Sequence, residues 1–305
     1  MPLKINIITT INNGVGLQVE TQLLKQVLTS MGHYVLPVHR LDPNSARPAD
    51  LNIFIEIVSD KFFFTAPRNW LIPNPEWYYP QAWDRYLTKI DAVLCKTQDA
   101  YRLFNDRHRN AVYTGFMSVD WFDPKVRRRR EFLHVQGKSR YKNTLAILKA
   151  WEQYKIKVPL TIIAENNPMQ NEIENVNWLG YVTPGVLRAL YNSRLFHLCP
   201  SEYEGFGHYI HEALGCEALV VTSDLPPMNE FKGCPAELLV PVRETYQCQI
   251  ATMARIDPTD VAGIVERCMS LNDDEIETYR REARIAYDFE VRDFQERLAQ
   301  VIGSL

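Results

Sequence analysis

Two glutamates, Glu204 and Glu212, flank a glycine turn with seven residues between them. The apolar run 195–199 that precedes them predicts a buried strand, and a helix is expected to open near Gly207. The first turn of a helix leaves backbone N–H groups unpaired and carries roughly half a positive charge. Because glycine lets a ligand approach those amides closely, this turn is suited to bind a phosphate group.

The spacing of the two glutamates limits what they can do together. If the segment between them is mostly helical, they lie about 12 Å apart, whereas two carboxyls that cleave one glycosidic bond lie roughly 5–9.5 Å apart. They are better placed to hold the two ends of one ligand whose phosphates sit at the helix tip. A nucleotide-sugar has this shape. The alternative interpretation is an ordinary strand–helix unit whose glutamates face solvent.

The stretch 200–212 resembles the Glu-x7-Glu signature of retaining GT-B glycosyltransferases of the family 4 type, the group 1 glycosyl transferases, and the continuation 213–223 fits the same pattern. The resemblance implies that Glu204 contacts hydroxyls of the donor sugar and that Glu212 hydrogen-bonds the ribose. It also implies that further residues lie at the donor site, namely the amides of Phe206, Gly207 and His208, which receive the distal phosphate, and Glu230.

Two positions depart from the family pattern just after the predicted helix. Glu217 stands where the family usually has glycine, and Leu219 replaces a common proline. Because of these departures, the family pattern does not predict the geometry of the turn after the helix. The expected fold is unaffected.

Three cations, Lys138, Arg140 and Lys142, follow a strand predicted at 132–136, and cations at a strand end can neutralise a diphosphate. The segment resembles the family's Arg…Lys element, with Lys138 at the Arg position and Lys142 at the Lys position. Since lysine lacks the bidentate geometry of arginine, Arg140 is a candidate to share that role. The resemblance implies that Glu204, Lys138 and Lys142 are catalytic. A solvated helix start is the alternative.

Two weaker signals concern glycines. Gly14 and Gly16 lie between the first predicted strand and helix, but they lack the third glycine of the dinucleotide fingerprint, so a tight turn explains them equally well. The family places a glycine loop here against the donor phosphates. The residues Gly180, Tyr181 and Val182 resemble a segment whose backbone meets the nucleobase, and a turn at a strand end is again the alternative.

The first half of the chain is where an acceptor is expected to bind, and the resemblance is weak there. Many relatives have a histidine after the strand predicted at 51–58, where this chain has Glu56 and Asp60. Glu76 and Trp77 belong to an aromatic segment that could line an acceptor site, although such segments more often belong to a core. These four residues are the acceptor-side candidates.

Composition excludes several classes of function. A net charge of −3 gives no general attraction to nucleic acid, and no run of about 20 apolar residues predicts a membrane span. The six scattered cysteines suggest reduced thiols and a cytoplasmic location. His208 and His211 lack a recognisable third ligand, so neither a metal nor another cofactor is expected. The basic run Lys125–Arg130 could be solvated or could contact anionic lipid at the membrane face.

Strand and helix signals alternate along the chain, which predicts an α/β fold with parallel sheets. We expect the GT-B architecture, with a Rossmann-like acceptor-binding domain at 1–123 and a Rossmann-like nucleotide-sugar domain at 124–285. A C-terminal helix at 286–305 is expected to pack back on the first domain. Ligands of such folds bind at the carboxyl ends of the strands, which here means a cleft between the halves.

The predicted function is therefore transfer of a sugar, of the hexosyltransferase type, from a nucleotide-diphosphate sugar to an acceptor, with retention and without metal. The acceptor could be a glycan, a lipid-linked sugar or a small molecule. Three alternatives stay open: a nucleotide-sugar epimerase of the same fold, a non-catalytic nucleotide-sugar-binding protein, and a structural partner in a glycan-assembly complex. The base, the sugar and the oligomeric state do not follow from the sequence.

Overall fold

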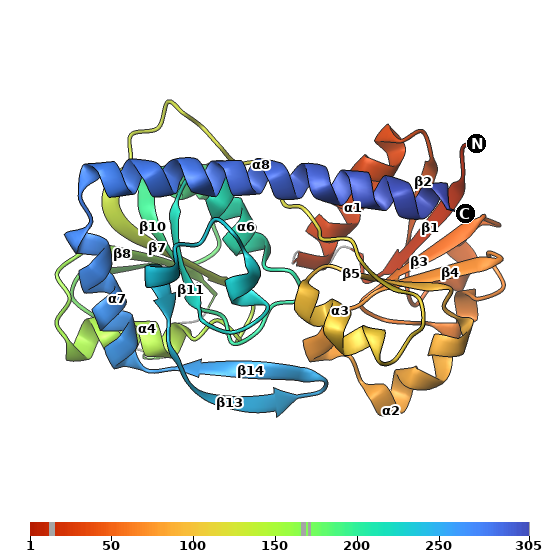
Figure 1. Cartoon of the computed structure of the whole chain (residues 1–305), viewed down its shortest axis with the longest axis horizontal. Helices are drawn as coiled ribbons and strands as arrows, with labels where there is room; N and C mark the ends of the chain where they lie inside the picture. Colours follow the sequence, from red (N-terminus) through yellow and green to blue (C-terminus); the bar gives the residue numbers. More distant parts are fainter. Residues whose placement is uncertain (12–15, 166–168, 170–171, 305) are drawn as a thin grey trace. The chain divides into compact units, whose positions relative to one another are not determined.

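The computed structural model describes residues 1–11, 16–165, 169 and 172–304, and its contacts divide the chain into two compact units (Figure 1). Unit 1 consists of Met1–Ser118, Gln247–Ala251 and Glu290–Leu305, and unit 2 of Val119–Tyr246 and Thr252–Phe289. The sequence analysis predicted domain boundaries after residues 123 and 285. The structure changes unit after Ser118 and Phe289, and it also assigns the segment 247–251 to unit 1.

Unit 1 contains a six-stranded parallel sheet in the order β2-β1-β3-β4-β5-β6. Its strands are β1 (Lys4–Thr9), β2 (Tyr34–His39), β3 (Leu51–Ile55), β4 (Arg68–Ile72), β5 (Ala92–Cys95) and β6 (Ala111–Tyr113). Its helices include α1 (Gly16–Ser30), α2 (Pro80–Trp83) and α3 (Gln98–Asn105). Every residue of β3 and β5 is buried, as expected for parallel strands that are covered on both faces.

Two segments from later in the chain complete unit 1. Ile250 packs into the apolar cluster that contains Phe54 and Tyr78. Phe294 is almost fully buried, and its ring centroid lies 4.8 Å from that of Phe116. The first unit therefore depends on residues far beyond the boundary at 118.

Unit 2 contains a second six-stranded parallel sheet, in the order β12-β11-β10-β7-β8-β9. Its strands are β7 (Arg129–Gly137), β8 (Leu160–Ala164), β9 (Val176–Leu179), β10 (Arg194–Cys199), β11 (Leu219–Ser223) and β12 (Leu239–Val240). Its helices include α4 (Thr144–Gln153), α5 (Pro184–Ser193), α6 (His208–Gly215) and α7 (Pro258–Ser270).

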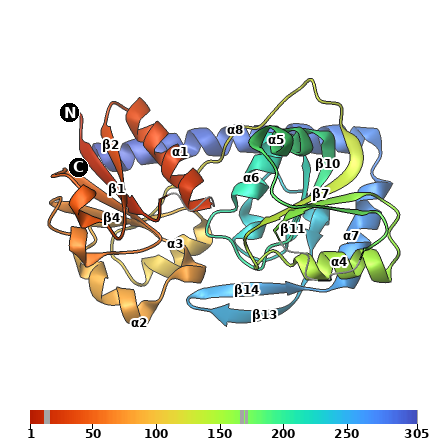
Figure 2. The same ribbon diagram turned by 180° about the vertical axis from the view of Figure 1, so that it is seen from behind.

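Alternate residues of β10 face opposite sides of this second sheet. Phe196 belongs to the apolar core that α4 and α7 cover, where it stacks on Phe132 at a centroid distance of 4.9 Å. The next residue, His197, contacts Tyr191 of α5, which packs against β10 and β7 (Figure 2). Helices therefore cover both faces of this sheet. Only the ends of its strands and the loops that follow them are left to carry a binding site.

Two further elements lie outside both six-stranded sheets. Strands β13 (Val242–Cys248) and β14 (Ala251–Ile256) form a separate two-stranded sheet, a hairpin that the sequence analysis did not predict (Figure 1). The last helix, α8 (Asp273–Gly303), is continuous over 31 residues. Residues 273–289 of this helix belong to unit 2 and residues 290–303 to unit 1.

Candidate functional site

The candidate site lies at the carboxyl edge of the unit 2 sheet, where the segment 200–207 joins β10 to α6. Helix α6 begins at His208 with Gly207 as its N-cap, which confirms the predicted helix start. Gly207 has φ +103, a conformation that side chains rarely adopt, and a Cβ here would lie 3.2 Å from the Phe231 ring. The sequence needs glycine at this helix tip for both reasons.

Glu204 and Lys142 form an ion pair in front of this helix. The Lys142 ammonium donates to Oε1 of Glu204 and also lies 3.5 Å from the centre of the Tyr209 ring. Ser201 donates its hydroxyl to the same carboxylate oxygen, and its Oγ is 2.6 Å from the hydroxyl of Tyr209. Both charged side chains are more than four-fifths buried, so solvent screens their attraction only weakly.

Hydrogen bonds between two loops hold Lys142 in this position. The loop 138–143 leaves β7 after Gly137, and Asn143 adopts a left-handed conformation with φ +50. The side-chain amide of Asn143 donates to the carbonyl oxygens of Pro200 (2.9 Å) and Ala254 (3.3 Å). The backbone N–H of Glu202 donates to the carbonyl of Tyr141 at 2.8 Å. The loop with the cation and the loop with the carboxylate are thus bound directly to each other.

A buried histidine under these loops was missed by the sequence analysis. His134 in β7 lies 2.7 Å through Nδ1 from the carbonyl of Leu198 and 2.8 Å through Nε2 from the hydroxyl of Thr144. Burial lowers the pKa of His134 to about 4, so its ring is neutral at physiological pH. It can then donate to the carbonyl and accept from the hydroxyl, which joins β7, β10 and the start of α4. An isolated histidine within a strand carries no sequence signal for this role.

The hairpin also supports the candidate site. The backbone N–H of Ala254 donates to the carbonyl of Glu202 at 2.7 Å, and the Tyr246 hydroxyl donates to the carboxylate of Glu202. Both contacts fix the segment that carries Glu204. Because they join residues about fifty positions apart, no local pattern could have predicted them.

Glu212 lies on the second turn of α6 and accepts a hydrogen bond from the Tyr191 hydroxyl at 3.0 Å. Burial raises the pKa of the Glu212 carboxyl, an effect that the nearby His208 partly opposes. Because the helix begins only at His208, the rise of about 1.5 Å per residue behind the estimate of about 12 Å holds only for residues 208–212.

The other predicted donor-side residues of unit 2 are spread along the same edge. Lys138 is half exposed and pairs with Glu165 at 3.4 Å, and Arg140 lies 5.4 Å from the ring centre of Tyr141. The remaining ones are Gly180, Tyr181 and Val182, which follow β9, Phe206, which is buried against Phe231, and Glu230, which ends a short helix. No contact among the described residues joins Lys138 to the pair of Lys142 and Glu204.

The candidates in unit 1 lie in different surroundings. Gly14 is outside the described residues, and Gly16 is the first residue of α1. Glu56 has φ +68 and accepts a hydrogen bond from Asn74 at 2.8 Å, and burial raises the pKa of its carboxyl. Asp60 accepts from Tyr86 at 3.2 Å. Glu76 is buried, and the neighbouring Trp77 has 38% of its surface exposed.

A buried charge pair beside Glu56 was also missed. The ammonium of Lys96, whose side chain has no exposed surface, donates to Glu20 at 2.5 Å and to Asn74 at 2.7 Å. Asn74 therefore links this pair to Glu56 at the carboxyl ends of β3, β4 and β5. A lysine at the end of an apolar strand gave no sign of this arrangement.

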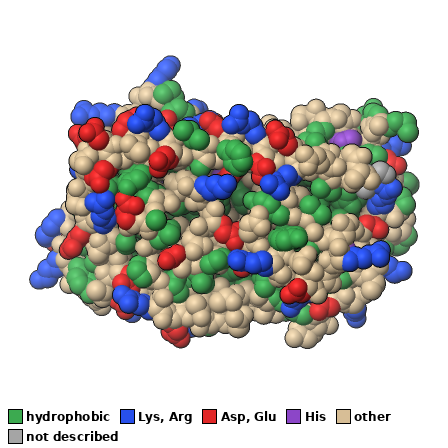
Figure 3. Space-filling model, in the orientation of Figure 1, with side chains coloured by type: hydrophobic (Ala, Val, Ile, Leu, Met, Phe, Trp, Pro, Cys, Tyr) green, Lys and Arg blue, Asp and Glu red, His purple; other side chains and the backbone are tan. Residues whose placement is uncertain are grey.

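The basic run Lys125–Arg130 is only partly solvated. Arg128 pairs with Glu217, and Arg130 donates to the carbonyl of Leu271 at 2.7 Å. Lys125 and Arg127 are exposed. On the face that Figure 3 draws, basic and acidic side chains are interspersed.

Two kinds of site are absent from the part of the chain that the structure describes. Within residues 1–11, 16–165, 169 and 172–304, no three His, Cys, Asp or Glu side chains are grouped as a metal site would require. Among the helices of those same ranges, none is both long and apolar enough to cross a membrane.

Comparison with known proteins finds a family model that matches part of the chain. Residues 130–255 match the family model described as glycosyl transferases group 1. This segment runs from the second residue of β7 almost to the end of β14, and it includes both Lys142 and Glu204. No curated protein matches the chain.

Solved structures resemble the chain over both units. A glycosyltransferase from Rickettsia africae has a TM-score of 0.71 at 12% identity, with 97% of each chain covered. Sucrose-phosphate synthase from Thermosynechococcus elongatus has a TM-score of 0.70 at 12% identity, covering 99% of this chain and 98% of that one. These likenesses and the two parallel-sheet units show that the chain has the GT-B fold.

A third solved structure is larger than this chain. The pneumococcal O-GlcNAc transferase GtfA, solved in complex with UDP and GlcNAc, has a TM-score of 0.62 at 15% identity. The likeness covers 83% of this chain but only 56% of that protein. The chain thus spans little more than half the length of this relative.

Proposed function

We propose that this protein is a glycosyltransferase that moves a sugar from a nucleotide-diphosphate sugar to an acceptor, with retention and without a metal ion. The match of residues 130–255 to group 1 glycosyl transferases and the GT-B fold support this proposal. The observation that carries it is the ion pair of Lys142 and Glu204 in front of the N-terminus of α6.

Each part of this arrangement suits one part of the donor. The amides at Gly207 and His208 begin a helix, where the partial positive charge favours the distal phosphate. Lys142 supplies a full positive charge from the neighbouring loop. Glu204 is an acceptor of hydrogen bonds from sugar hydroxyls. A donor that binds here would replace part of the internal pairing of Lys142 with Glu204 by its own phosphate and hydroxyl groups.

Catalysis would come from charge that is already in place. During transfer, the bond between the anomeric carbon and the phosphate oxygen breaks and a bond to the acceptor oxygen forms. Negative charge then develops on the leaving diphosphate, where Lys142 and the helix tip stabilise it. Lys138 and Arg140 lie on the same loop and would add longer-range attraction to the phosphates. The proton of the acceptor hydroxyl leaves with the diphosphate.

The remaining assignments complete the proposed donor site. Glu212 would hold the ribose, the backbone at 180–182 would meet the nucleobase, and Glu230 would lie near the donor. On the acceptor side, Glu56 is the strongest candidate because its carboxylate is half buried, accepts from Asn74 and lies at a strand end in a left-handed conformation. Asp60, Glu76 and Trp77 would contribute to the surroundings of the acceptor.

Calorimetry against UDP, GDP, ADP, TDP and CDP tests the proposal, followed by turnover assays with the sugar-bearing forms of any nucleotide that binds. We expect one preferred diphosphate, weakened about tenfold or more in Glu212→Ala by loss of a charged hydrogen bond. Binding without turnover over a broad acceptor panel would favour a binding protein, and conversion of the donor without transfer would favour an epimerase. Absence of any nucleotide binding would contradict the proposal.

A further inference from the structure

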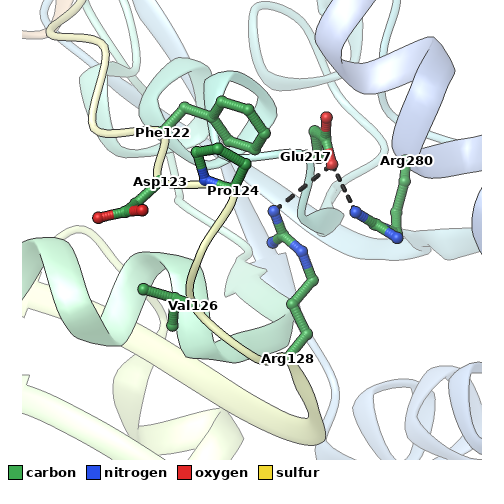
Figure 4. Close-up of a pocket in the computed structure, with 7 residues that line it drawn as sticks. All are labelled: Phe122, Asp123, Pro124, Val126, Arg128, Glu217 and Arg280. Carbon is green, nitrogen blue, oxygen red and sulfur yellow. Dashed lines mark hydrogen bonds and ion pairs between the residues drawn. The ribbon is translucent and has the colours of Figure 1, made fainter.

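A polar cavity lies in unit 2 away from the proposed donor site. It has a volume of about 340 Å³ and is lined by Phe122, Asp123, Pro124, Val126, Arg128, Glu217 and Arg280 (Figure 4). Arg128 directly precedes β7, and Glu217 lies just before β11. In a parallel sheet the amino ends of the strands share one edge, so this cavity is at the edge opposite to Glu204 and Lys142.

Glu217 has an unusual backbone for its residue type. Its φ is +54, in the left-handed region, where a residue other than glycine carries a conformational cost. Glycine would meet the needs of this turn after α6 without that cost. A strained non-glycine residue is a reason to look for a role of its side chain.

That side chain holds two arginines. Oε2 of Glu217 lies 2.6 Å from Nη2 of Arg280 and 3.5 Å from Nη2 of Arg128. The arginines come from separate elements and converge on this one carboxylate, as the dashed lines in Figure 4 show. Glu277 pairs with the other terminal nitrogen of Arg280 at 2.8 Å, but its side chain is half exposed.

The two guanidinium groups have donors to spare. Nη1 of Arg128 and Nε of Arg280 are buried and have no hydrogen-bond partner among the described residues. Burial and the neighbouring Arg280 lower the pKa of Arg128, as expected for a cation whose charge is incompletely compensated. Asp123 is the remaining carboxylate of the lining, and it is engaged by the backbone of Lys125 and by Arg188.

We propose that this cavity is a second anion site, in which Arg128 and Arg280 bind a phosphate group in competition with Glu217. A phosphate has several acceptor oxygens and matches the fork of a guanidinium group, so it can satisfy donors that one carboxylate leaves unused. The ligand is the phosphate of a small phosphate ester or of a lipid head group. The exposed Lys125 and Arg127 on the adjoining loop would favour either source.

Inorganic phosphate is the probe for this site, titrated calorimetrically and by thermal shift at constant ionic strength. Arg128→Gln should weaken phosphate binding about tenfold or more, because it removes charge-assisted hydrogen bonds. Glu217→Gly should strengthen binding, because it removes the competing carboxylate and glycine accepts the left-handed backbone. A purely structural ion pair predicts no gain in the glycine variant.

The proposed donor site could also bind phosphate, so Lys142→Gln serves as the control. Phosphate affinity that changes with residues 128 and 217 but not with residue 142 supports the second site, whether or not the chain transfers sugars. Equal affinity in all variants, or a loss confined to Lys142→Gln, overturns it. Sedimentation with phosphatidylcholine vesicles, with and without phosphatidic acid, then identifies the source. Wild-type binding to the acidic vesicles that Arg128→Gln lacks indicates a lipid head group, and no vesicle binding indicates a soluble ester.

Discussion

At the scale of single residues, the candidate site is defined by a charge pair that is shielded from water. Lys142 and Glu204 would each be costly to bury alone, and each offsets the cost of the other. The aromatic face of Tyr209 and the hydroxyl of Ser201 fix the geometry further. If a donor diphosphate binds here, as we propose, it would meet a cation whose position is set before binding, which is the condition for electrostatic stabilisation of a leaving group.

Removal of the Lys142 cation should therefore impair chemistry. We expect Lys142→Ala to lower kcat by roughly 10²–10³-fold, the usual loss when one preorganised donor to a developing anion is removed. The matched control is Lys138→Ala, whose half-exposed ammonium pairs with Glu165, and its loss should be smaller. Steady-state kinetics with the preferred donor measures both, and circular dichroism checks the fold. Equal kcat in Lys142→Ala and wild type would exclude Lys142 from the site.

The buried His134 should make the free energy of unfolding depend on pH in the acid range. Its pKa is about 4 in the folded protein and ordinarily 6.5. Between these values the unfolded chain binds a proton that the folded chain does not, so the free energy of unfolding should fall as pH drops through this window. The slope is at most about 1.4 kcal/mol per pH unit for this group.

Urea unfolding of wild type and His134→Gln at several pH values between 6.5 and 4 measures this contribution. Glutamine can still donate and accept but does not titrate, so its acid slope should be shallower. Some slope will remain, because burial also lowers the pKa of His197, to about 3. Identical slopes in the two proteins would show that His134 does not contribute.

At the scale of elements, the start of α6 depends on one glycine. Gly207→Ala combines a left-handed backbone with a Cβ placed 3.2 Å from Phe231 and 3.3 Å from Ile210. We expect a loss of roughly 1–3 kcal/mol in stability, and weaker nucleotide binding because the helix tip must shift. Gly185→Ala is the control, since it lies in the first turn of α5 with no atom within 4 Å of the added Cβ. Thermal unfolding with and without nucleotide compares the two, and similar effects would refute the special role of Gly207.

The hairpin is the element that the local pattern missed. Strand β13 is mostly exposed, whereas β14 is mostly buried and donates a backbone hydrogen bond to Glu202. Tyr246 adds a contact to the Glu202 side chain. The hairpin therefore holds the loop that carries Glu204 in place. The local sequence of the hairpin contains no pattern that predicts these contacts.

At the scale of the whole molecule, α8 contributes residues to both units. Residues 273–289 count with unit 2, whereas Phe294, Leu298 and Ile302 are buried in unit 1. Unit 1 is thus assembled from three separated stretches of chain. Its stability depends on contacts between residues almost two hundred positions apart, such as that of Phe116 with Phe294.

Truncation of Phe294 should therefore weaken unit 1. We expect Phe294→Ala to cost about 3–5 kcal/mol, the usual loss for a fully buried aromatic ring. Ile285→Ala on the same helix should cost almost nothing, because 67% of its surface is exposed. Hydrogen exchange followed by mass spectrometry should show faster exchange in peptides of β5 and β6 in the first variant alone. Protection of those peptides that is equal in both variants would contradict the assignment of this segment to unit 1.

The sequence by itself determined the parallel α/β fold and the start of α6, because apolar periodicity and glycine positions are local properties. The strand predicted at 195–199 is β10 to within one residue, and the strand predicted at 132–136 lies inside β7. It also singled out Glu204 and Lys142 as candidates, one from the glycine turn and the other from a strand end. The contact between the two side chains could not be predicted from the sequence, because the residues are sixty-two positions apart.

Only the tertiary structure decided what each charged side chain contacts. It paired Lys142 with Glu204 but Lys138 with Glu165, and it turned Arg128 inward to Glu217. It also placed Lys96 and His134 in the interior, where local sequence gives no indication of their partners. The physical reason is that ion pairs and buried hydrogen bonds depend on distance in space, which the order of residues along the chain does not specify.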